Sequence, residues 1–354
     1  MSASTTIFIT GTTGYIGGSV LQRLLTHPNA STFKFTTITR SADKAKLLKE
    51  KYHIDAHVGD FTNVQKLEEL SAGANVVVHT ADADDFGAAK AILAGLKKRH
   101  ETTGEVPILI HTSGTGVLTD DAKGEKTMDK IYHDSKPEEI ESIPDTAIHR
   151  NVDLLIVDAD KAGYIRSHIV LPSTIWGLAT GPLVDDGIQN PHSVQIPGLI
   201  KAGLARGQAG MVGEGKNVWP NVNIDDVADL YIVIFDAAIK DPKTPHGREG
   251  FYFGETGEHK LYDVCKAVAV ALHEIGRSKT AEPVTFTDEE CQKYFGGTYL
   301  GTNSRCVAEQ GRKLGWKPVH NNEGYFKSIK PEVDALLALE KKGASVNTSK
   351  DFGR

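Results

Sequence analysis

The segment from Ile7 to Gly17 constrains the fold of this chain more than any other feature. It reads IFITGTTGYIG, so a short β-branched and aromatic run is followed by glycines at positions 11, 14 and 17. Glycine permits a tight turn after a strand and a close approach of the backbone to a ligand, and a following helix N-terminus offers N–H donors to an anion. Because residues 19–25 continue with apolar side chains at helical spacing, the context is strand, turn and helix. This order predicts a site for the pyrophosphate of a dinucleotide.

Short β-rich runs alternate with helical patterns through the first half of the chain. Strands are predicted over residues 5–10, 33–39, 54–58, 75–79 and 107–111, and helices over 19–25, 44–51, 64–70 and 86–100. Strands separated by helices indicate βαβ units, and right-handed crossovers then build a doubly wound parallel sheet. We therefore predict an α/β fold of the dinucleotide-binding Rossmann type.

The order of elements is less regular after Leu118. Residues 119–144 are charged and carry loop signals, and a helix over 151–161 and a strand over 165–171 follow. Further helices are predicted over 226–238, capped by Asp225, and over 262–275, 288–294 and 305–314. We expect a dinucleotide-binding domain over residues 1–180, a smaller C-terminal substrate lobe over 181–340 that is interleaved with it, and a polar tail over 341–354.

The net charge and the lack of long apolar runs argue against nucleic-acid and membrane partners, and the cysteine spacing indicates the redox state. The 354 residues carry a formal net charge of −6, which gives no basic surface for nucleic acid or anionic membranes. No apolar run is long enough to span a bilayer, and the N-terminus lacks the pattern of a signal peptide. Cys265, Cys291 and Cys306 show no C-x-x-C spacing, which is typical of reduced thiols in a cytoplasmic protein.

Further motifs follow the glycine-rich turn along most of the chain. They are GDF at 59–61, HTA at 79–81, HTS at 111–113, LPSTIWG at 171–177, VNIDDVA at 222–228 and LGWKP at 314–318. Together with the turn, they resemble the extended and atypical short-chain dehydrogenase/reductase superfamily, which contains NAD(P)-dependent epimerases, dehydratases and reductases. The resemblance follows the order of the family's motifs but does not select one activity.

This resemblance implies a set of cofactor-binding residues. Asp60 would contact the adenine amino group, the residues after the fourth strand would line the cofactor, and the LPST segment would lie beside the nicotinamide. The implied residues are Gly11, Thr13, Gly14, Tyr15, Ile16, Gly17, Arg40, Asp60, Phe61, Thr80, Ala81, Pro172, Ser173 and Thr174.

Arg40 decides which dinucleotide we expect. It follows the second predicted strand, where an acidic residue would accept the ribose 2′-hydroxyl of NAD and an arginine accommodates the 2′-phosphate of NADP. A guanidinium can bind that phosphate through two charge-assisted hydrogen bonds, and Lys44 lies nearby in the sequence. We therefore expect NADP(H) to be preferred over NAD(H).

Two alternatives remain for the proton donor. Reductases of the resembled family use Tyr-x-x-x-Lys, and Tyr132 and Lys136 have this spacing. However, Pro137 disfavours a helical conformation for Lys136, and Ser135 with Glu138 instead predicts a helix start with a capping box. The alternative donor is His149, with Arg150 as the cation, at the mouth of the helix over 151–161. Ser113 is expected to face the ligand from the end of its strand.

Other histidines and loops carry weaker predictions. His79 and His111 have no partner at metal-ligand spacing and are expected to be core residues with satisfied hydrogen bonds, so no metal site is predicted. Residues 294–303, with glycines at 296, 297 and 301, form either a loop over the substrate or a plain surface loop.

The expected function is NADPH-dependent reduction of a small carbonyl compound, by a chain that can form a homodimer. The alternatives are a sugar-nucleotide epimerase or dehydratase with tightly held NAD, and a non-catalytic NADP(H) sensor.

Overall fold

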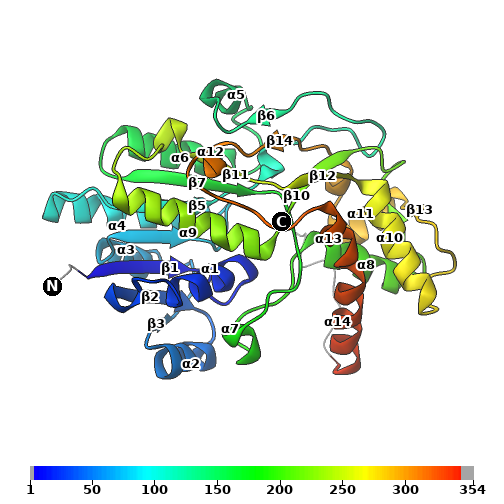
Figure 1. The fold of residues 1–354 in the computed structure, drawn as a ribbon, viewed down its shortest axis with the longest axis horizontal. Coiled ribbons are helices and arrows are strands. Elements are labelled where there is room, and N and C mark those ends of the chain that lie inside the picture. The colour runs from blue at the N-terminus through cyan, green and yellow to red at the C-terminus, as the bar shows by residue number, and fades with distance from the viewer. Residues whose placement is uncertain (1–3, 344–354) are drawn as a thin grey trace.

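The computed structural model describes residues 4–343 and is organised around one parallel sheet (Figure 1). The seven strands lie in the order β11-β7-β5-β4-β1-β2-β3, and every neighbouring pair runs parallel. This arrangement confirms the predicted doubly wound α/β fold. The strands are β1 (Thr5–Thr10), β2 (Phe33–Thr39), β3 (Asp55–Val58), β4 (Val76–His79), β5 (Ile108–Thr112), β7 (Arg166–Pro172) and β11 (Phe251–Gly254).

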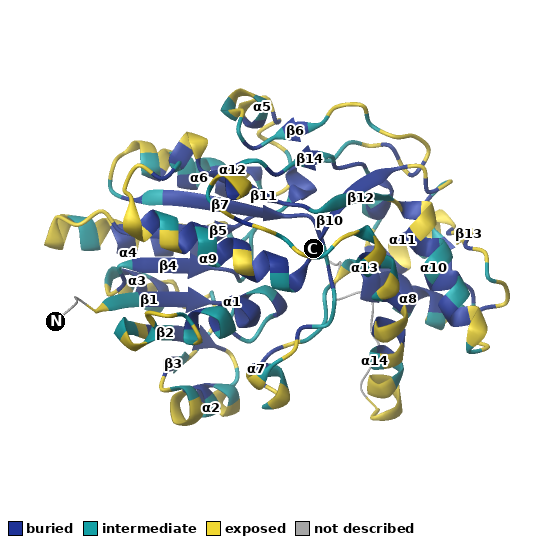
Figure 2. Cartoon of the chain, viewed as in Figure 1, coloured by how far each residue is buried: buried dark blue, intermediate teal, exposed yellow. Residues whose placement is uncertain are grey.

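Helices cover both faces of this sheet. α1 and α9 pack against each other on one face, and α3 and α4 pack together on the other, where α6 also contacts α4 (Figure 1). Because both faces are covered, the central strands are almost wholly buried (Figure 2). The flanking helices are α1 (Tyr15–Leu25), α2 (Ala42–Tyr52), α3 (Val64–Ala72), α4 (Phe86–Thr103), α6 (Arg150–Lys161) and α9 (Ile224–Lys240).

A second group of elements lies beyond the carboxyl ends of the strands (Figure 1). A three-stranded sheet in the order β12-β10-β8 packs with helices around a separate hydrophobic cluster that includes Trp176, Leu199 and Leu272. The chain leaves the central sheet after β7, builds part of this group, and returns to the sheet at β11. Its elements include β8 (Thr174–Trp176), α8 (Gln195–Arg206), β10 (Val218–Asn223), β12 (Gly257–Lys260), α10 (Leu261–Glu274), α11 (Asp288–Phe295), α13 (Asn322–Lys327) and α14 (Ile329–Lys341).

Several predicted elements differ from the structure. The expected loop over 119–144 contains a short strand, β6 (Tyr132–His133), and a helix, α5 (Pro137–Glu141). The expected helix over 305–314 begins as β14 (Cys306–Val307), which pairs with β6, and only α12 (Gln310–Lys313) is helical. Two-residue strands carry no periodicity that a sequence pattern could reveal.

Two predicted helix caps are also wrong. α9 begins at Ile224 and is capped by Asn223, whose side chain accepts from the backbone N–H of Asp225. α5 begins with Pro137 as predicted, but Ser135 does not cap it, since its hydroxyl bonds to the carboxylate of Glu309. The remaining short elements are α7 (Pro182–Asp185), β9 (Gly210–Met211) and β13 (Val284–Thr285), with 3-10 turns over 30–32, 115–118, 247–249 and 299–301.

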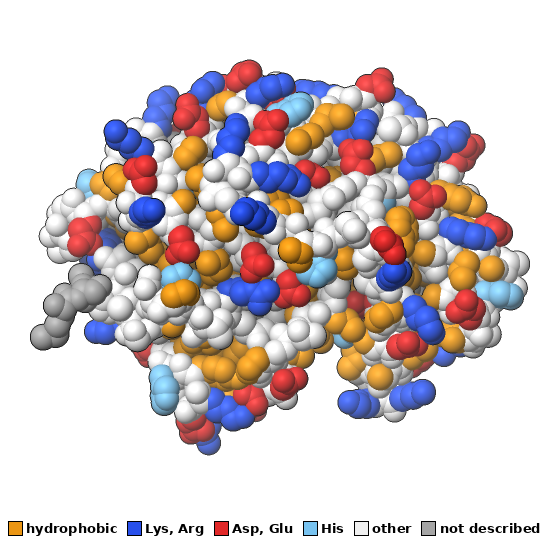
Figure 3. Space-filling model, in the orientation of Figure 1, with side chains coloured by type: hydrophobic (Ala, Val, Ile, Leu, Met, Phe, Trp, Pro, Cys, Tyr) orange, Lys and Arg blue, Asp and Glu red, His pale blue; other side chains and the backbone are white. Residues whose placement is uncertain are grey.

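The surface in Figure 3 carries lysine, arginine and carboxylate side chains side by side, without a large area of one sign. Between residues 4 and 343, no helix combines the length and apolar character that a membrane span needs. The three cysteines are buried free thiols. The predicted tail begins inside α14 at Lys341, and its residues 344–354 lie outside the described part of the chain.

Candidate functional site

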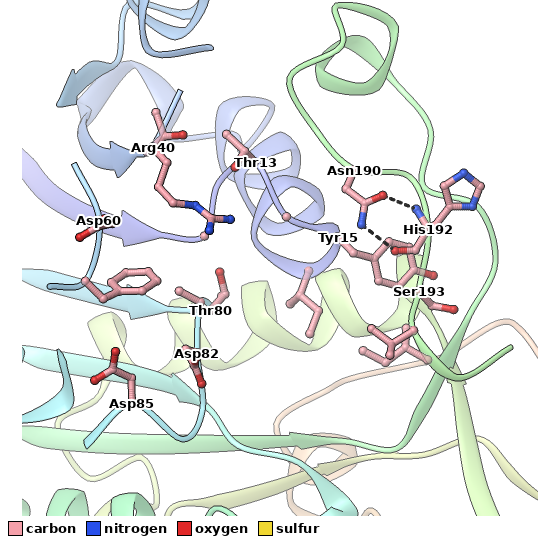
Figure 4. A pocket seen from close by; sticks show the side chains of 18 of the residues that line it. Thr13, Tyr15, Arg40, Asp60, Thr80, Asp82, Asp85, Asn190, His192 and Ser193 are labelled. Carbon is pink, nitrogen blue, oxygen red and sulfur yellow. Dashed lines mark hydrogen bonds between the residues drawn. The ribbon is translucent and has the colours of Figure 1, made fainter. Parts of the chain in front are cut away.

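A pocket of about 810 Å³ lies at the carboxyl ends of β1 to β4 (Figure 4). Its walls come from the glycine-rich turn after β1 and from the residues that follow β2, β3 and β4. Ser173, Ile175, a segment over residues 190–195 and Tyr299 close its other side. Carboxyl ends of parallel strands are the usual ligand-binding edge of such a sheet, so this pocket is the candidate site.

The turn after β1 depends on close backbone contacts. Gly11 has a φ of 71°, and its carbonyl oxygen accepts from the N–H of Gly14 at 2.8 Å. A β-carbon on Gly17 would lie 2.3 Å from both the Gly11 carbonyl oxygen and Oγ1 of Thr80. Thr80 in turn donates to the carbonyl of Thr10 at 2.6 Å, which ties the ends of β1 and β4 together. Only glycine fits at position 17 without moving this turn.

The N-terminus of α1 is left open to a ligand. No side chain caps α1, and its first turn contains no acidic residue. In contrast, side chains of Ser41, Asn63 and Asp85 cap α2, α3 and α4. The first N–H groups of a helix need hydrogen-bond acceptors, and the helix dipole favours negative charge there. The turn and the uncapped helix therefore fit the pyrophosphate of a dinucleotide.

The end of the pocket near β2 and β3 carries both an arginine and an aspartate. Arg40 is exposed and lines the pocket, and Figure 4 shows its side chain directed across the cavity. Asp60 accepts from the backbone N–H and the hydroxyl of Thr62, and these bonds hold its pKa below the ordinary value. Lys44 donates to the carbonyl of Ile188 at 2.7 Å, so its ammonium is already engaged by the chain.

The opposite wall is a segment that the sequence analysis did not assign to the site. Asn190 donates its backbone N–H to the carbonyl of Thr13, and the side chain of Gln189 donates to the carbonyl of Tyr15. The Nδ1 atom of His192 lies 2.6 Å from Oε1 of Glu332, a buried residue of α14. The backbone of His192 forms two hydrogen bonds with the side-chain amide of Asn190 (Figure 4). No motif marks this segment, because its residues meet α1 only in the folded chain.

The structure brings together most of the predicted cofactor residues. All of them line the pocket except Gly17, Pro172 and Thr174. Gly17 packs behind the turn against Gly11, Pro172 ends β7, and Thr174 in β8 lines a smaller neighbouring cavity.

Ser113 and His149 both lie near the start of α6, and neither lines the pocket. Ser113 follows β5 and donates its hydroxyl to Oδ2 of Asp153 at 3.1 Å. Burial raises the pKa of Asp153 to about 7, although the nearby His149 and Arg150 favour its charged form. His149 precedes α6 with a φ of 67°, and its Nδ1 lies 2.6 Å from Oδ1 of Asp84. The left-handed backbone is a strained conformation for histidine and is typical of functional sites.

Tyr132 and Lys136 lie elsewhere. Tyr132 is buried in β6, where it pairs with Cys306, and its ring lies 4.1 Å below Nζ of Lys130. Lys136 precedes α5 and forms an ion pair with Glu139 at 2.9 Å. Neither residue lines the pocket. The structure therefore separates this Tyr-x-x-x-Lys match from the candidate site, because Pro137 starts a new helix instead of continuing one through Lys136.

Three further predicted residues occupy the interior. Arg150 is buried, and its Nε has no hydrogen-bond partner among residues 4–343. His79 and His111 are core residues as predicted, with Nδ1 atoms 3.0 Å apart, but their hydrogen bonds are not all satisfied as predicted, because the Nε2 atom of each ring has no partner in the described part of the chain. Burial lowers the pKa of His79 to about 4, so both rings are neutral at neutral pH. No three His, Cys, Asp or Glu side chains within residues 4–343 gather as metal ligands.

Comparison with known families and proteins agrees with this geometry. Residues 11–139 match a family described as NAD(P)H-binding. The chain is 29% identical to the oxidase ucsJ of an Acremonium species over 332 residues, which cover 88% of this chain and 92% of that protein.

Solved structures share the whole architecture. The dTDP-glucose 4,6-dehydratase of Bacillus anthracis in complex with NAD is 16% identical, with a TM-score of 0.63, over 97% of this chain and 100% of that one. The yeast methylglyoxal/isovaleraldehyde reductase Gre2 in complex with NADPH is 14% identical, with a TM-score of 0.58, over 94% and 99%. The chain therefore has the fold of these NAD- and NADPH-complexed enzymes, and its residues 11–139 match the NAD(P)H-binding family.

Proposed function

We propose that this protein is an NADPH-dependent oxidoreductase that reduces the carbonyl group of a small compound without a nucleotide. The bound cofactor would supply the hydride. The glycine-rich turn and α1 would hold its pyrophosphate, and Arg40 its 2′-phosphate. This proposal is consistent with the reductase activity printed for the yeast structure and with the oxidase name of the Acremonium relative.

One observation carries the proposal: of the described residues that line the pocket, Arg40 is the single lysine or arginine. It lies where an NADP 2′-phosphate would be bound, and the smaller neighbouring cavity adds no other cation. A nucleotide-sugar substrate would bring a second pyrophosphate, whose charge needs its own cations or N–H donors. Besides Arg40, the lining instead offers neutral groups, His192, which is bound to Glu332, and the carboxylates of Asp60, Asp82 and Asp85.

The remaining chemistry needs a proton for the oxygen that receives the negative charge of reduction. We propose that this proton passes through His149, because Asp84 binds its Nδ1 and leaves Nε2 directed at Gly114 and Gly116. Asp153 follows His149 by four residues, which is the spacing of the family's Tyr-x-x-x-Lys. In this proposal Ser113 and Asp153 hold the start of α6 in place, so that the imidazole stays beside the end of β5.

The sensor hypothesis is the second candidate, and the absence of Tyr132 and Lys136 from the pocket lining favours it. A protein that binds NADPH without a working proton donor would report the redox state and perform no turnover.

NADPH oxidation, followed by absorbance against a panel of ketones, aldehydes and enones, tests the proposal. We expect turnover with at least one class, and NADPH binding about 10- to 100-fold tighter than NADH binding, as a charge-assisted bidentate contact predicts. Tight NADPH binding without any turnover would favour the sensor. NAD retained through purification would instead favour an epimerase or dehydratase.

A further inference from the structure

Tyr299 is a pocket residue that comes from the C-terminal third of the chain. It opens a 3-10 turn over residues 299–301 and lines the same pocket as the glycine-rich turn after β1. From the sequence, residues 294–303 are predicted to form either a loop over the substrate or a plain surface loop. The structure places one aromatic side chain of the segment inside the candidate site.

Tyr299 and His149 converge above Gly116. A β-carbon on Gly116 would lie 2.5 Å from Oη of Tyr299 and 3.3 Å from Nε2 of His149, so both polar atoms are close to one point. A β-carbon on Gly114 would also lie 3.3 Å from Nε2 of His149. These glycines follow Ser113 at the end of β5, and they leave the space in which the phenol and the imidazole meet.

The hydroxyl of Tyr299 has no hydrogen-bond partner among the described residues. Two interior tyrosines do have one: Tyr231 bonds to Thr112, and Tyr252 donates to the carbonyl of Pro245. Tyr299 is partly exposed and lines the pocket, so its hydroxyl is available to a ligand atom there. Burial and the nearby Asp84 raise the pKa of Tyr299, which keeps the phenol protonated and able to donate at neutral pH.

The backbone around Tyr299 is held firmly. The side chain of Asn217 donates to the carbonyls of Leu300 and Thr302, and the indole of Trp219 also donates to Thr302. The ring of Tyr299 packs on that indole with the ring centres 5.6 Å apart. The phenol is therefore pre-positioned by Asn217, which precedes β10, and by Trp219 of β10, and it does not depend on a ligand to order it.

We infer that Tyr299 is the catalytic acid that contacts the substrate oxygen, and that His149 is a positioning and proton-supplying residue behind it. This inference rests on the proposed function. As hydride adds to the carbonyl carbon, the C–O π bond breaks and the oxygen takes the phenolic proton of Tyr299. The phenolate then takes a proton from Nε2 of His149, which solvent replaces, while Asp84 stabilises the charged imidazole through Nδ1.

Tyr299→Phe tests the inference, because it removes the hydroxyl and keeps the ring on Trp219. We expect kcat to fall by about two to four orders of magnitude, with the dissociation constant of NADPH within about twofold and the melting temperature unchanged. Tyr294→Phe is the matched control: this buried tyrosine of α11 belongs to the same segment but does not line the pocket, and all its parameters should stay at wild-type values.

A second variant tests the role of His149. His149→Gln keeps a polar side chain but cannot pass on a proton, so it should lower kcat and leave the KM for the carbonyl substrate nearly unchanged. NADPH binding should again be unchanged.

The possible outcomes separate the two proposals. If wild-type protein reduces a carbonyl compound and Tyr299→Phe matches it, the acid assignment is wrong and the proposed function stands. If Tyr299→Phe instead weakens NADPH binding or lowers the melting temperature, the residue is structural and the inference fails. If wild-type protein turns over no carbonyl compound, the proposed function is overturned and this inference falls with it.

Discussion

Gly17→Ala probes the close packing of the turn after β1, which in the proposed function would hold the cofactor pyrophosphate. The added β-carbon would lie 2.3 Å from the carbonyl oxygen of Gly11 and 2.3 Å from Oγ1 of Thr80, whereas ordinary contacts begin at 3.4 Å. Each atom must therefore move by about 1 Å. Moving the carbonyl weakens its 2.8 Å bond from Gly14, and moving Thr80 weakens its 2.6 Å bond to the carbonyl of Thr10.

The expected cost follows from these contacts. Overpacking costs about 1–3 kcal/mol, and each of two weakened buried hydrogen bonds adds about 1 kcal/mol. The sum is about 3–5 kcal/mol of unfolding free energy. With an unfolding entropy of about 2.1 cal/mol/K per residue, this corresponds to a decrease in melting temperature of about 4–7 °C for a chain of this length. The turn that would present N–H groups to the pyrophosphate in the proposed function also moves, so NADPH binding should weaken by more than about tenfold.

Thermal unfolding followed by circular dichroism and NADPH fluorescence titration measure both effects. Gly73→Ala is the control, because a β-carbon there meets its nearest neighbour, the carbonyl of Leu70, at an ordinary 3.5 Å. That variant should be neutral or slightly stabilised. Thr80→Ala in the Gly17→Ala background relieves one of the two contacts and should restore part of the melting temperature. Equal melting temperatures and NADPH affinities for Gly17→Ala and Gly73→Ala would refute the close-packing argument.

Three further predictions concern other parts of the site. Arg40→Ala should weaken NADPH binding by about 10- to 100-fold and leave NADH binding nearly unchanged, because only the 2′-phosphate contact is lost; parallel titrations with both dinucleotides measure this. Tyr132→Phe should keep kcat within about twofold of wild type, because this phenol is remote from the pocket lining, and a loss of two orders of magnitude would restore the Tyr132–Lys136 hypothesis. The raised pKa of Asp153, about 7, means that the folded state resists its ionisation, so the contribution of this group to wild-type stability should fall as pH rises from 4 towards 8. Asp153→Asn cannot ionise, and denaturant titrations should therefore show it gaining stability relative to wild type over that range; a constant difference would contradict the assigned burial effect.

Much of the central sheet could be predicted from local patterns. β1 and β2 have the predicted bounds, and β4 lies within one residue of its prediction, because each is a short apolar run between turn signals. The second half was less predictable. β6 and β14 are two residues each and exist only because distant parts of the chain pair. Such pairing leaves no periodicity in either segment, and this is why residues 305–314 were wrongly predicted as one helix.

The residues of the candidate site also fall into two groups: those that local motifs indicate and those that only tertiary packing brings to the pocket. Residues at the ends of β1 to β4 could be assigned from motifs, because the strand order alone brings those ends to one edge. His149 was one of two alternatives, and its spacing from Asp153 could have indicated the family's helix position. Tyr299 and residues 190–195 could not be assigned, since their contacts with Gly116 and Thr13 depend on tertiary packing of the second group of elements.

The return of the chain to the central sheet at β11 has a consequence for synthesis and engineering. A nascent chain that ends near residue 180 contains β7 with one unpaired edge, because residues 251–254 have not yet been made. Ile169, Val170 and Leu171 are fully buried once β11 pairs, so the unfinished edge would be an apolar template for unwanted strand pairing. A chimera that exchanges the substrate-side elements must therefore keep α9 and β11 with the N-terminal half, and the cut points belong on either side of residues 224–254.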